Sequence, residues 1–299
     1  MKRLLFFINP NAGHAEIRTS LMEVLAIFCK GGYEPTVHMT TGPRDITRQI
    51  AARGTQYDLI VCTGGDGTLN EAVSGLMELP YEKRPPLGYI PGGTVNDVAS
   101  TLGLSKDPIR AAQEIVAGRL YPLDIGSFGP DRFFTYVAAF GIFTDVPYET
   151  PQEDKQVLGR LAYFLHGVKA LGEVKPIHAR VEFENQALEL DVLDGLVCST
   201  TSVGGVLALD SLGISLNDGQ SELLLVRDIK NLIDFNNVST ALLKSDFREN
   251  ENIVSKKVRR VHFTFDTPVD WSLDGEYGGT VTDVEIVNHQ RAVNIIVPR

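Results

Sequence analysis

The stretch "VCTGGDGTLNE", residues 61–71, places small and polar residues directly after an apolar run and directly before residues with a helical pattern. Glycines at such a turn let the backbone approach a ligand closely, and the N–H groups at the start of the following helix suit a phosphate. An aspartate, Asp66, stands among these glycines. The stretch therefore predicts a strand, a ligand-binding turn and a helix, and it raises the question of what the carboxylate does there.

The same succession of strand and helix extends over about the first 125 residues. Four apolar segments predict strands: "RLLFFI" (residues 3–8), "PTVHM" (35–39), "DLIVC" (58–62) and "PLGYI" (86–90). Residues with helical spacing follow them, for example over residues 17–28 after the first strand and 70–79 after the third. Strands that are apolar throughout and alternate with helices predict a parallel sheet covered by helices.

From about Tyr121 onward, polar and apolar residues alternate instead, which predicts antiparallel strands. The clearest segments are "HARVEFE" (178–184), "VHFTFD" (261–266) and "RAVNIIV" (291–297). Helices are expected over residues 156–171 and 232–243, and an exposed connection over residues 244–257. The expected fold class is α/β plus β: an α/β domain over residues 1–123 and an antiparallel β-rich sandwich domain over residues 124–299. The final strand, near residues 291–299, can return to the first domain.

The composition is that of an ordinary globular protein, and it excludes some partners. Of 299 residues, 43% are hydrophobic and 22% are charged, with a formal net charge of -10. This surplus of carboxylates argues against binding of nucleic acid, whose phosphates they would repel. The three cysteines, Cys29, Cys62 and Cys198, are far apart, so they suggest neither a metal site nor disulfides and favour a reducing cytoplasm. No apolar stretch approaches the roughly 18 residues of a membrane-spanning helix.

Three glycine-containing turns follow three of the predicted parallel strands: "NPNAG" (9–13), "GGDGT" (64–68) and "PGGTVND" (91–97). Because such strand ends gather at one edge of an α/β sheet, the three turns are expected to face one crevice. Each turn alone also fits a simple tight turn, but together they indicate a nucleotide site. The pattern is neither GxxxxGK[ST] nor GxGxxG, which excludes the two common phosphate loops.

Six motifs occur in the order found in the diacylglycerol kinase catalytic family: "NPNAG", "GGDGTLNE", "PGGTVND", "LDIG" (123–126), "LNDG" (216–219) and "LDGEYG" (273–278). The chain resembles the soluble bacterial lipid kinases of that family over essentially its whole length. GGDGT alone also fits NAD kinases and, less closely, phosphofructokinases. The resemblance implies transfer of a phosphoryl group from ATP to a lipid hydroxyl, in a cleft between an α/β nucleotide domain and a β-rich domain, and it implies a homodimer.

The resemblance, together with motif position, assigns a set of residues to ATP. They are Asn9, Pro10, Asn11, Ala12, Gly13, Thr40, Gly64, Gly65, Asp66, Gly67, Thr68, Leu69, Asn70, Thr94 and Asn96. Asp66 implies Mg²⁺, because a carboxylate beside a triphosphate is repelled unless a cation lies between them. Asp97 and Asp124 are expected in the same Mg²⁺ network, by resemblance and because both follow predicted strands. Asp97 also fits a helix N-cap, and Asp124 also fits a turn residue.

The resemblance further implies a catalytic pair from the second half of the chain, which acts together with Asp66. A lipid hydroxyl is a poor nucleophile at neutral pH, so a positioned base helps it to attack. Glu276 matches the base of the family and Asp274 its supporting residue, although Asp-Gly also fits a hairpin turn. Two residues that are two apart in an extended chain point to the same side, so both can enter one site.

A second, structural metal site is implied by "LNDG". In the similar kinases an aspartate and main-chain carbonyls hold Mg²⁺ far from the phosphates, which maps onto Asp218 with the carbonyls of Ser215 and Gln220. A single carboxylate with carbonyls suits a hard cation that keeps several waters. An Asn-Asp-Gly β-turn without metal is the alternative that the residues alone leave open.

Several functions remain open on the sequence alone. Diacylglycerol, converted to phosphatidic acid, is the first acceptor considered; a sphingoid base or NAD is the alternative, and so is a weakly catalytic sensor of nucleotide or lipid. His14 stands where the family often has lysine, so the interpretation as a weakly catalytic sensor remains open. The expected location is the cytoplasm, with transient contact at the inner face of the membrane. The basic run "KKVRR" (256–260) fits either lipid headgroups or a solvated strand face.

Overall fold

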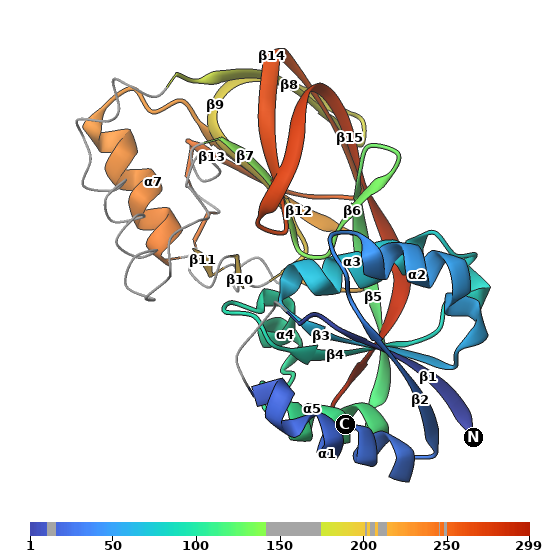
Figure 1. Cartoon of the computed structure of the whole chain (residues 1–299). Helices are drawn as coiled ribbons and strands as arrows, with labels where there is room; N and C mark the ends of the chain where they lie inside the picture. The colour runs from blue at the N-terminus through green and yellow to red at the C-terminus, as the bar shows by residue number, and fades with distance from the viewer. Residues whose placement is uncertain are drawn as a thin grey trace.

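The computed structural model describes residues 1–10, 16–141, 175–200, 202–203, 207–208, 214–244, 246–247 and 250–299. It consists of an α/β half and a β-rich half, with α7 beside the latter (Figure 1). The helix expected over residues 156–171 lies outside the described residues.

The α/β half is built from alternating strands and helices. In chain order its elements are β1 Lys2–Ile8, α1 Glu16–Lys30, β2 Tyr33–Met39, α2 Asp45–Arg53, β3 Leu59–Gly64, α3 Asp66–Met77, β4 Leu87–Pro91, α4 Asp97–Leu102 and α5 Pro108–Ala117, with short 3-10 helices at Gly54–Gln56 and Tyr81–Lys83. The strands pair in parallel in the order β2-β1-β3-β4, so the predicted parallel sheet is confirmed.

Helices cover both faces of this sheet because the side chains of each strand alternate between them. Leu4 and Phe6 of β1 belong to a buried cluster with residues of α1 and α5. Leu5 and Phe7 of the same strand belong to a cluster with residues of α2 and α3. A strand that is apolar at every position therefore has a partner on each side, as its sequence predicts.

The β-rich half contains antiparallel strands around an aromatic core. Its elements are β6 Arg132–Phe134, β7 Val137–Gly141, β8 Ile177–Phe183, β9 Gln186–Cys198, β10 Ser202–Val203, β11 Leu207–Ala208, β12 Ser221–Arg227, α7 Leu232–Lys244, β13 Ile253–Val258, β14 Arg260–Leu273 and β15 Glu276–Val297. Phe140 lies at the centre of its core, with ring centroids 4.6 Å from Trp271 and 5.7 Å from Phe263. The helix expected over residues 232–243 is confirmed by α7.

Two long strands, β5 (Arg119–Phe128) and β15, connect the halves (Figure 1). The first part of β15 pairs with β14, its later part pairs with β5, and Ile295 near its end lies beside Leu87 of β4. The described strands other than β10 and β11 thus form one 13-stranded sheet. Since β5 runs across residue 123, the two halves share this sheet, and a domain boundary at that position stays a prediction.

Three local expectations were wrong. The segment 244–257 is not an open connection throughout, because β13 begins at Ile253 and pairs with β12. The helix α3 begins at Asp66 rather than at residue 70, since the glycine turn itself forms its first turn. Asp124 does not follow a strand but lies inside β5.

Candidate active site

The three glycine-containing turns meet at one edge of the parallel sheet, as far as they are described. The main-chain N–H of Asn9 donates to the carbonyl of Thr63 at 3.5 Å, and that of Gly92 donates to the carbonyl of Gly64 at 2.7 Å. The Asn9 amide also lies 3.5 Å from the Thr68 hydroxyl. Residues from the ends of β1, β3 and β4 are therefore neighbours, as the sequence predicts.

Glycine is required where two of these turns touch. A Cβ atom on Gly93 would lie 2.6 Å from the Cα of Gly65, so a side chain at this position would push the turns apart. The turn that contains Gly93 is ordered by Asn96, whose Oδ1 accepts the Gly93 N–H at 3.0 Å. The Tyr89 hydroxyl lies 3.1 Å from the same oxygen and 3.0 Å from the carbonyl of Gly64. Asn96 is buried, so it holds the turns in place from within the protein.

Asp66 is the first residue of α3 and has one oxygen without a partner. Its Oδ2 accepts the main-chain N–H of Asn96 at 2.9 Å. Its Oδ1 is buried and has no hydrogen-bond partner in the described structure. Burial, and the charges of Asp97 and Asp274, raise the pKa of Asp66 to about 6. A buried carboxylate oxygen of this kind is suited to a cation or a proton.

Asp274, in the turn between β14 and β15, is by contrast fully engaged. One of its oxygens accepts hydrogen bonds from the N–H and hydroxyl of Thr135, at 2.6 and 2.8 Å, and from the side chain of Asn70, at 2.8 Å. The other accepts the N–H groups of Tyr136, at 2.9 Å, and Val137, at 3.1 Å. Burial raises the pKa of Asp274, and these bonds oppose that rise. Asp274 therefore fixes its own turn to α3 and to the β6–β7 segment.

Glu276 begins β15 and faces the start of α3. A Cβ atom on Gly67 would collide with Oε1 of Glu276, so the carboxylate lies directly against the glycine turn. Burial, and the charges of Glu71 and Asp274, raise the pKa of Glu276. The residue as a whole is exposed, unlike Asp274, so its carboxylate remains accessible beside the turn.

At the second predicted metal site, the turn at residues 216–220, protein groups contact the carboxylate of Asp218, and its role in binding metal stays a prediction. The Gln220 N–H donates to Oδ1 of Asp218 at 3.0 Å, and Nζ of Lys257 lies 3.6 Å from Oδ2. Lys257 also lies 3.4 Å from the buried carboxylate of Glu222. The carbonyls of Ser215 and Gln220 belong to the same turn. In the described part of the chain, no three His, Cys, Asp or Glu side chains are grouped so as to hold a metal ion.

Asp124 lies against this second turn. Its Oδ2 accepts the Gly219 N–H and its Oδ1 accepts the Arg291 N–H, both at 2.6 Å. Burial raises its pKa, and the charge of Asp218 adds to that rise. Asp97 and Asp274 thus lie close enough for their charges to act on Asp66, and Asp124 lies close enough to Asp218 for the same effect.

The remaining predicted nucleotide residues have different surroundings. Thr40 follows β2, and its N–H donates to the carbonyl of Ile8 at 2.9 Å, which places it at the same sheet edge. Thr94 is exposed in its turn. The side chain of Leu69 is fully buried in the core, so only its main chain faces the turn. Pro10 is described, whereas Asn11, Ala12 and Gly13 lie outside the described residues, as does His14.

Two residues near the site were not predicted. Tyr89 lies in an apolar segment that predicts a strand, and the sequence of that segment does not reveal what its hydroxyl contacts. Glu71 closes the quoted stretch, and its position in the motif is the only signal that marks it. The Tyr89 hydroxyl contacts the carbonyl of Gly64, and the Glu71 carboxylate accepts the N–H of Arg44.

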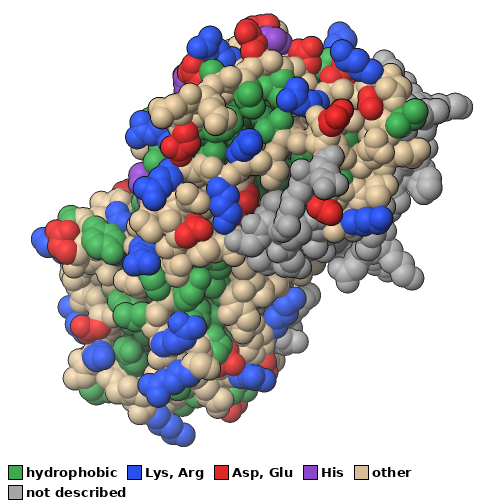
Figure 2. Space-filling model, turned by 180° about the vertical axis from the view of Figure 1, so that it is seen from behind, with side chains coloured by type: hydrophobic (Ala, Val, Ile, Leu, Met, Phe, Trp, Pro, Cys, Tyr) green, Lys and Arg blue, Asp and Glu red, His purple; other side chains and the backbone are tan. Residues whose placement is uncertain are grey.

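The basic run at residues 256–260 lies on two strands of the β-rich half. Lys257 pairs with acidic residues as described, and Arg260 pairs with Glu285 at 3.1 Å. Figure 2 shows Lys and Arg side chains spread over both halves among acidic ones on the side of the molecule that faces away in Figure 1. These contacts favour the strand-face interpretation of the run.

Comparison with known proteins supports the family that the sequence motifs indicate. The profile of the diacylglycerol kinase catalytic domain matches residues 3–128. A diacylglycerol kinase of Bacillus subtilis (strain 168) is 36% identical to this chain, with 100% of the chain and 97% of the relative covered. The chain belongs to the diacylglycerol kinase family. A diacylglycerol kinase of Staphylococcus haemolyticus is 32% identical over 97% of the chain and 87% of the relative.

Solved structures agree with this family in fold. A crystal structure of a diacylglycerol kinase from Bacillus anthracis str. Sterne superposes with a TM-score of 0.76 at 21% identity, covering 99% of this chain and 97% of that one. The family fold, an α/β part followed by a β-rich part, is therefore shared. Among the helices that the structure describes, none is both long and apolar enough to cross a membrane.

Proposed function

We propose that this member of the diacylglycerol kinase family transfers the γ-phosphoryl group of ATP to a lipid hydroxyl, with diacylglycerol as acceptor and phosphatidic acid as product. The observation that carries the proposal is the unpartnered Oδ1 of Asp66 at a glycine turn that Glu276 faces across Gly67. A nucleotide-binding edge and an accessible carboxylate from the other half of the chain are then adjacent. The names of the relatives support the acceptor class.

The nucleotide would lie along the edge formed by Asn9, Gly64 to Thr68 and the turn of Gly93. Within this edge the start of α3 has main-chain N–H groups without a partner inside the helix, and together with the Thr68 hydroxyl they are suited to phosphate oxygens. Asp66 fits a Mg²⁺ ion, because its Oδ1 is a buried oxygen with no other partner and a hard cation that keeps its waters needs few protein oxygens. A bound Mg²⁺ supplies neutralisation of phosphate charge. Asp97, beside Asp66, is the second carboxylate of this network.

Glu276 would act as the base. Its carboxylate accepts the proton of the acceptor hydroxyl, and its raised pKa brings it nearer to neutral pH, where a base both ionises and holds the proton well. Asp274 keeps the turn in place through its hydrogen bonds and does not itself receive the proton. The lipid would reach Glu276 from a bilayer surface, so we propose a peripheral contact with the membrane from the cytoplasmic side.

The test is phosphorylation of diacylglycerol in mixed micelles by the purified protein with Mg²⁺ and labelled ATP. We expect Glu276→Gln and Asp66→Asn each to lower kcat by at least about a thousandfold, the size of effects at groups that act on the transferred proton or charge. Glu285→Gln, on the same strand and paired with Arg260, is the matched control and should keep its activity. Wild-type activity in both site variants would refute the mechanism. A panel with sphingosine and NAD as acceptors decides the substrate.

A further inference from the structure

The helix α2 begins without a cap of its own. Its N-cap residue, Arg44, has a left-handed backbone with φ 61° and makes no side-chain hydrogen bond to the helix. The first N–H groups of a helix have no partner within it, so they need acceptors from elsewhere. The loop at residues 40–44, which connects β2 to α2, begins with Thr40 at the nucleotide edge. How α2 is capped therefore determines where this loop lies.

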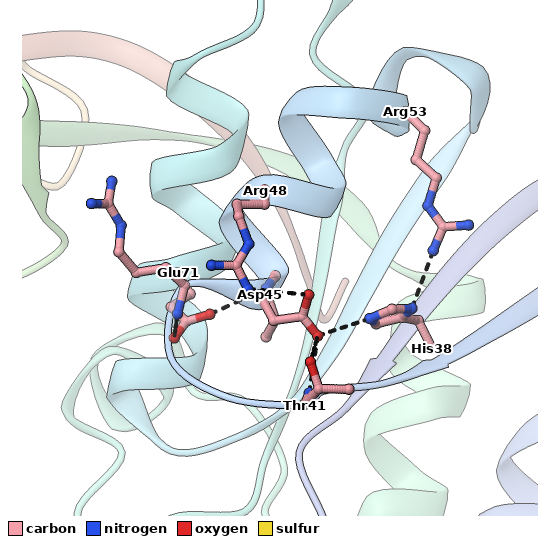
Figure 3. A network of polar contacts seen from close by, with 8 residues as sticks. His38, Thr41, Asp45, Arg48, Arg53 and Glu71 are labelled. Carbon is pink, nitrogen blue, oxygen red and sulfur yellow. Dashed lines mark hydrogen bonds and ion pairs between the residues drawn. The ribbon is translucent and has the colours of Figure 1, made fainter.

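Glu71 of α3 provides the missing cap. Its Oε1 accepts the Arg44 N–H at 2.7 Å, and its Oε2 accepts the Ile46 N–H at 3.2 Å. The hydroxyl of Thr47 donates to the main-chain carbonyl of Glu71 at 2.9 Å. Figure 3 shows the Glu71 carboxylate facing the start of α2. Because this cap comes from a neighbouring helix, it fixes the start of α2 and also joins α2 to α3.

The other end of the loop is held by Asp45, the first residue of α2. Its Oδ2 accepts both the N–H and the hydroxyl of Thr41, at 2.9 and 3.1 Å, and lies 3.0 Å from Nε2 of His38 (Figure 3). Burial alone would raise the pKa of Asp45, but the hydrogen bonds from His38 and Thr41 outweigh it and lower the pKa to about 2. The loop is thus fastened at both ends by carboxylates, and the lowered pKa of Asp45 keeps that carboxylate charged near neutral pH.

The helices approach so closely that the cap has little freedom. A Cβ atom on Gly75 of α3 would lie 2.9 Å from the carbonyl of Thr47 and 2.8 Å from the Cβ of Ile50 in α2. On another side of α3, Asn70 donates to Asp274 at 2.8 Å and to the carbonyl of Phe133 at 2.9 Å. Two adjacent residues of α3 therefore connect it to α2 and to the turn that carries Glu276.

We infer that Glu71 is a positioning residue, which by capping α2 from α3 holds the loop at residues 40–44, and with it Thr40, at the sheet edge where the glycine turns meet. The expected change in the KM for ATP rests on the proposed function, whereas the expected change in amide hydrogen exchange does not. Without the cap, the Arg44 and Ile46 N–H groups lose their acceptor, and the loop samples positions in which Thr40 has left the sheet edge.

The test substitutes Glu71→Gln, which preserves the shape of the side chain but replaces one acceptor oxygen by an N–H group that faces another N–H. We expect amide hydrogen exchange at Arg44 and Ile46 to increase about tenfold or more, because the amides lose a charge-assisted bond. We expect the KM for ATP to rise roughly tenfold, since a loop that positions nucleotide affects binding before chemistry. Loss of the Glu71 charge also lowers the pKa of Glu276, so kcat is compared on the alkaline plateau of its pH profile, where it should change by less than about twofold. Glu78→Gln, at the exposed end of the same helix, is the control and should change neither quantity.

Three outcomes decide the inference. Wild-type exchange at Arg44 and Ile46 in a cooperatively melting Glu71→Gln protein would overturn it, and so would a fall in kcat with an unchanged KM for ATP. Faster exchange in a protein that phosphorylates no lipid would uphold the positioning role while the proposed function fails. If Glu71→Gln does not fold, Thr47→Val, which removes only the bond to the Glu71 carbonyl, replaces it, with a smaller increase expected at the same amides.

Discussion

The turn at the start of α3 and the turn at residues 216–220 look alike in sequence and differ in structure. Both combine aspartate with glycine, and both were predicted to bind metal. Asp66 keeps one buried oxygen without a partner. Asp218 and its neighbour Asp124 have their oxygens directed to Gln220, Lys257, Gly219 and Arg291.

The two turns therefore differ in whether a buried carboxylate oxygen lacks a partner within the described structure. Buried polar groups in proteins are almost always hydrogen-bonded, so an exception needs a reason such as an absent ligand. At residues 216–220 the ammonium of Lys257 already supplies a positive charge to two carboxylates. The first turn has the open acceptor that ligand binding requires, and the second joins β5, β12 and β15 with the donors of the chain itself.

The largest effect that distinguishes the two turns is the pH dependence of the reaction. The pKa of Asp66 is raised to about 6, and we expect its ionised form to be the active one. The rate should therefore fall about tenfold for each pH unit below about 6 and level off above it. Asp218→Asn should keep this profile, because it lies in the other turn. A profile of kcat/KM for ATP between pH 4.5 and 8 checks this, and a rate that is constant down to pH 5 would contradict it.

A second, smaller effect is on the free energy of unfolding. The folded-state pKa of Asp66, about 6, lies above its ordinary value of 3.8, so ionisation of this carboxylate lowers the stability of the fold. This cost is absent below about pH 4 and complete above about pH 6. We expect Asp66→Asn to raise the free energy of unfolding at pH 8 by roughly 1–2 kcal/mol. Asp124→Asn should lower it by about 1–3 kcal/mol, since the N–H group of Gly219 or of Arg291 loses its acceptor, and this loss outweighs the charge cost that the raised pKa of Asp124 implies. Urea unfolding of both variants gives the values, and shifts of equal sign would contradict the distinction.

The smallest effect concerns Lys257. Burial raises the pKa of Glu222 to about 7, and the charge of Lys257 opposes that rise. With Lys257→Met the pKa of Glu222 rises further, so its ionised form costs the fold more. We expect a loss of about 1 kcal/mol at pH 8.5 and much less at pH 6, where Glu222 is protonated. Thermal unfolding at both pH values measures this loss. Lys256→Met, at the exposed neighbouring position in β13, is the control. A pH-independent loss would show that Lys257 contributes by packing alone.

The sequence predicts the elements that have a clear period and misses those that depend on distant partners. The strand of Leu4 to Phe7 follows from apolarity alone, since both of its faces are covered. The strand β13 was missed, because "SKK" hides the buried positions Ile253, Val254 and Val258.

The candidate site divides in the same way. That the three turns gather at one edge follows from the direction of parallel strands. That Asp124 meets Gly219, 95 residues away, depends on how β5 is placed in the sheet, and no local pattern encodes it. The cap that Glu71 gives to α2 is equally invisible, because its two partners are main-chain N–H groups and have no sequence signature.

The strand β15 has a consequence for the energetics of catalysis. It begins with Glu276 and reaches the parallel sheet beside β4 at Ile295, so one continuous backbone leads from the proposed base to the sheet whose edge is proposed to bind the nucleotide. The free energy needed to bring base and nucleotide edge together is thus provided once, when the chain folds. Substrate binding does not have to supply it again at each turnover, and more of the binding energy remains for the affinity of the lipid and the nucleotide.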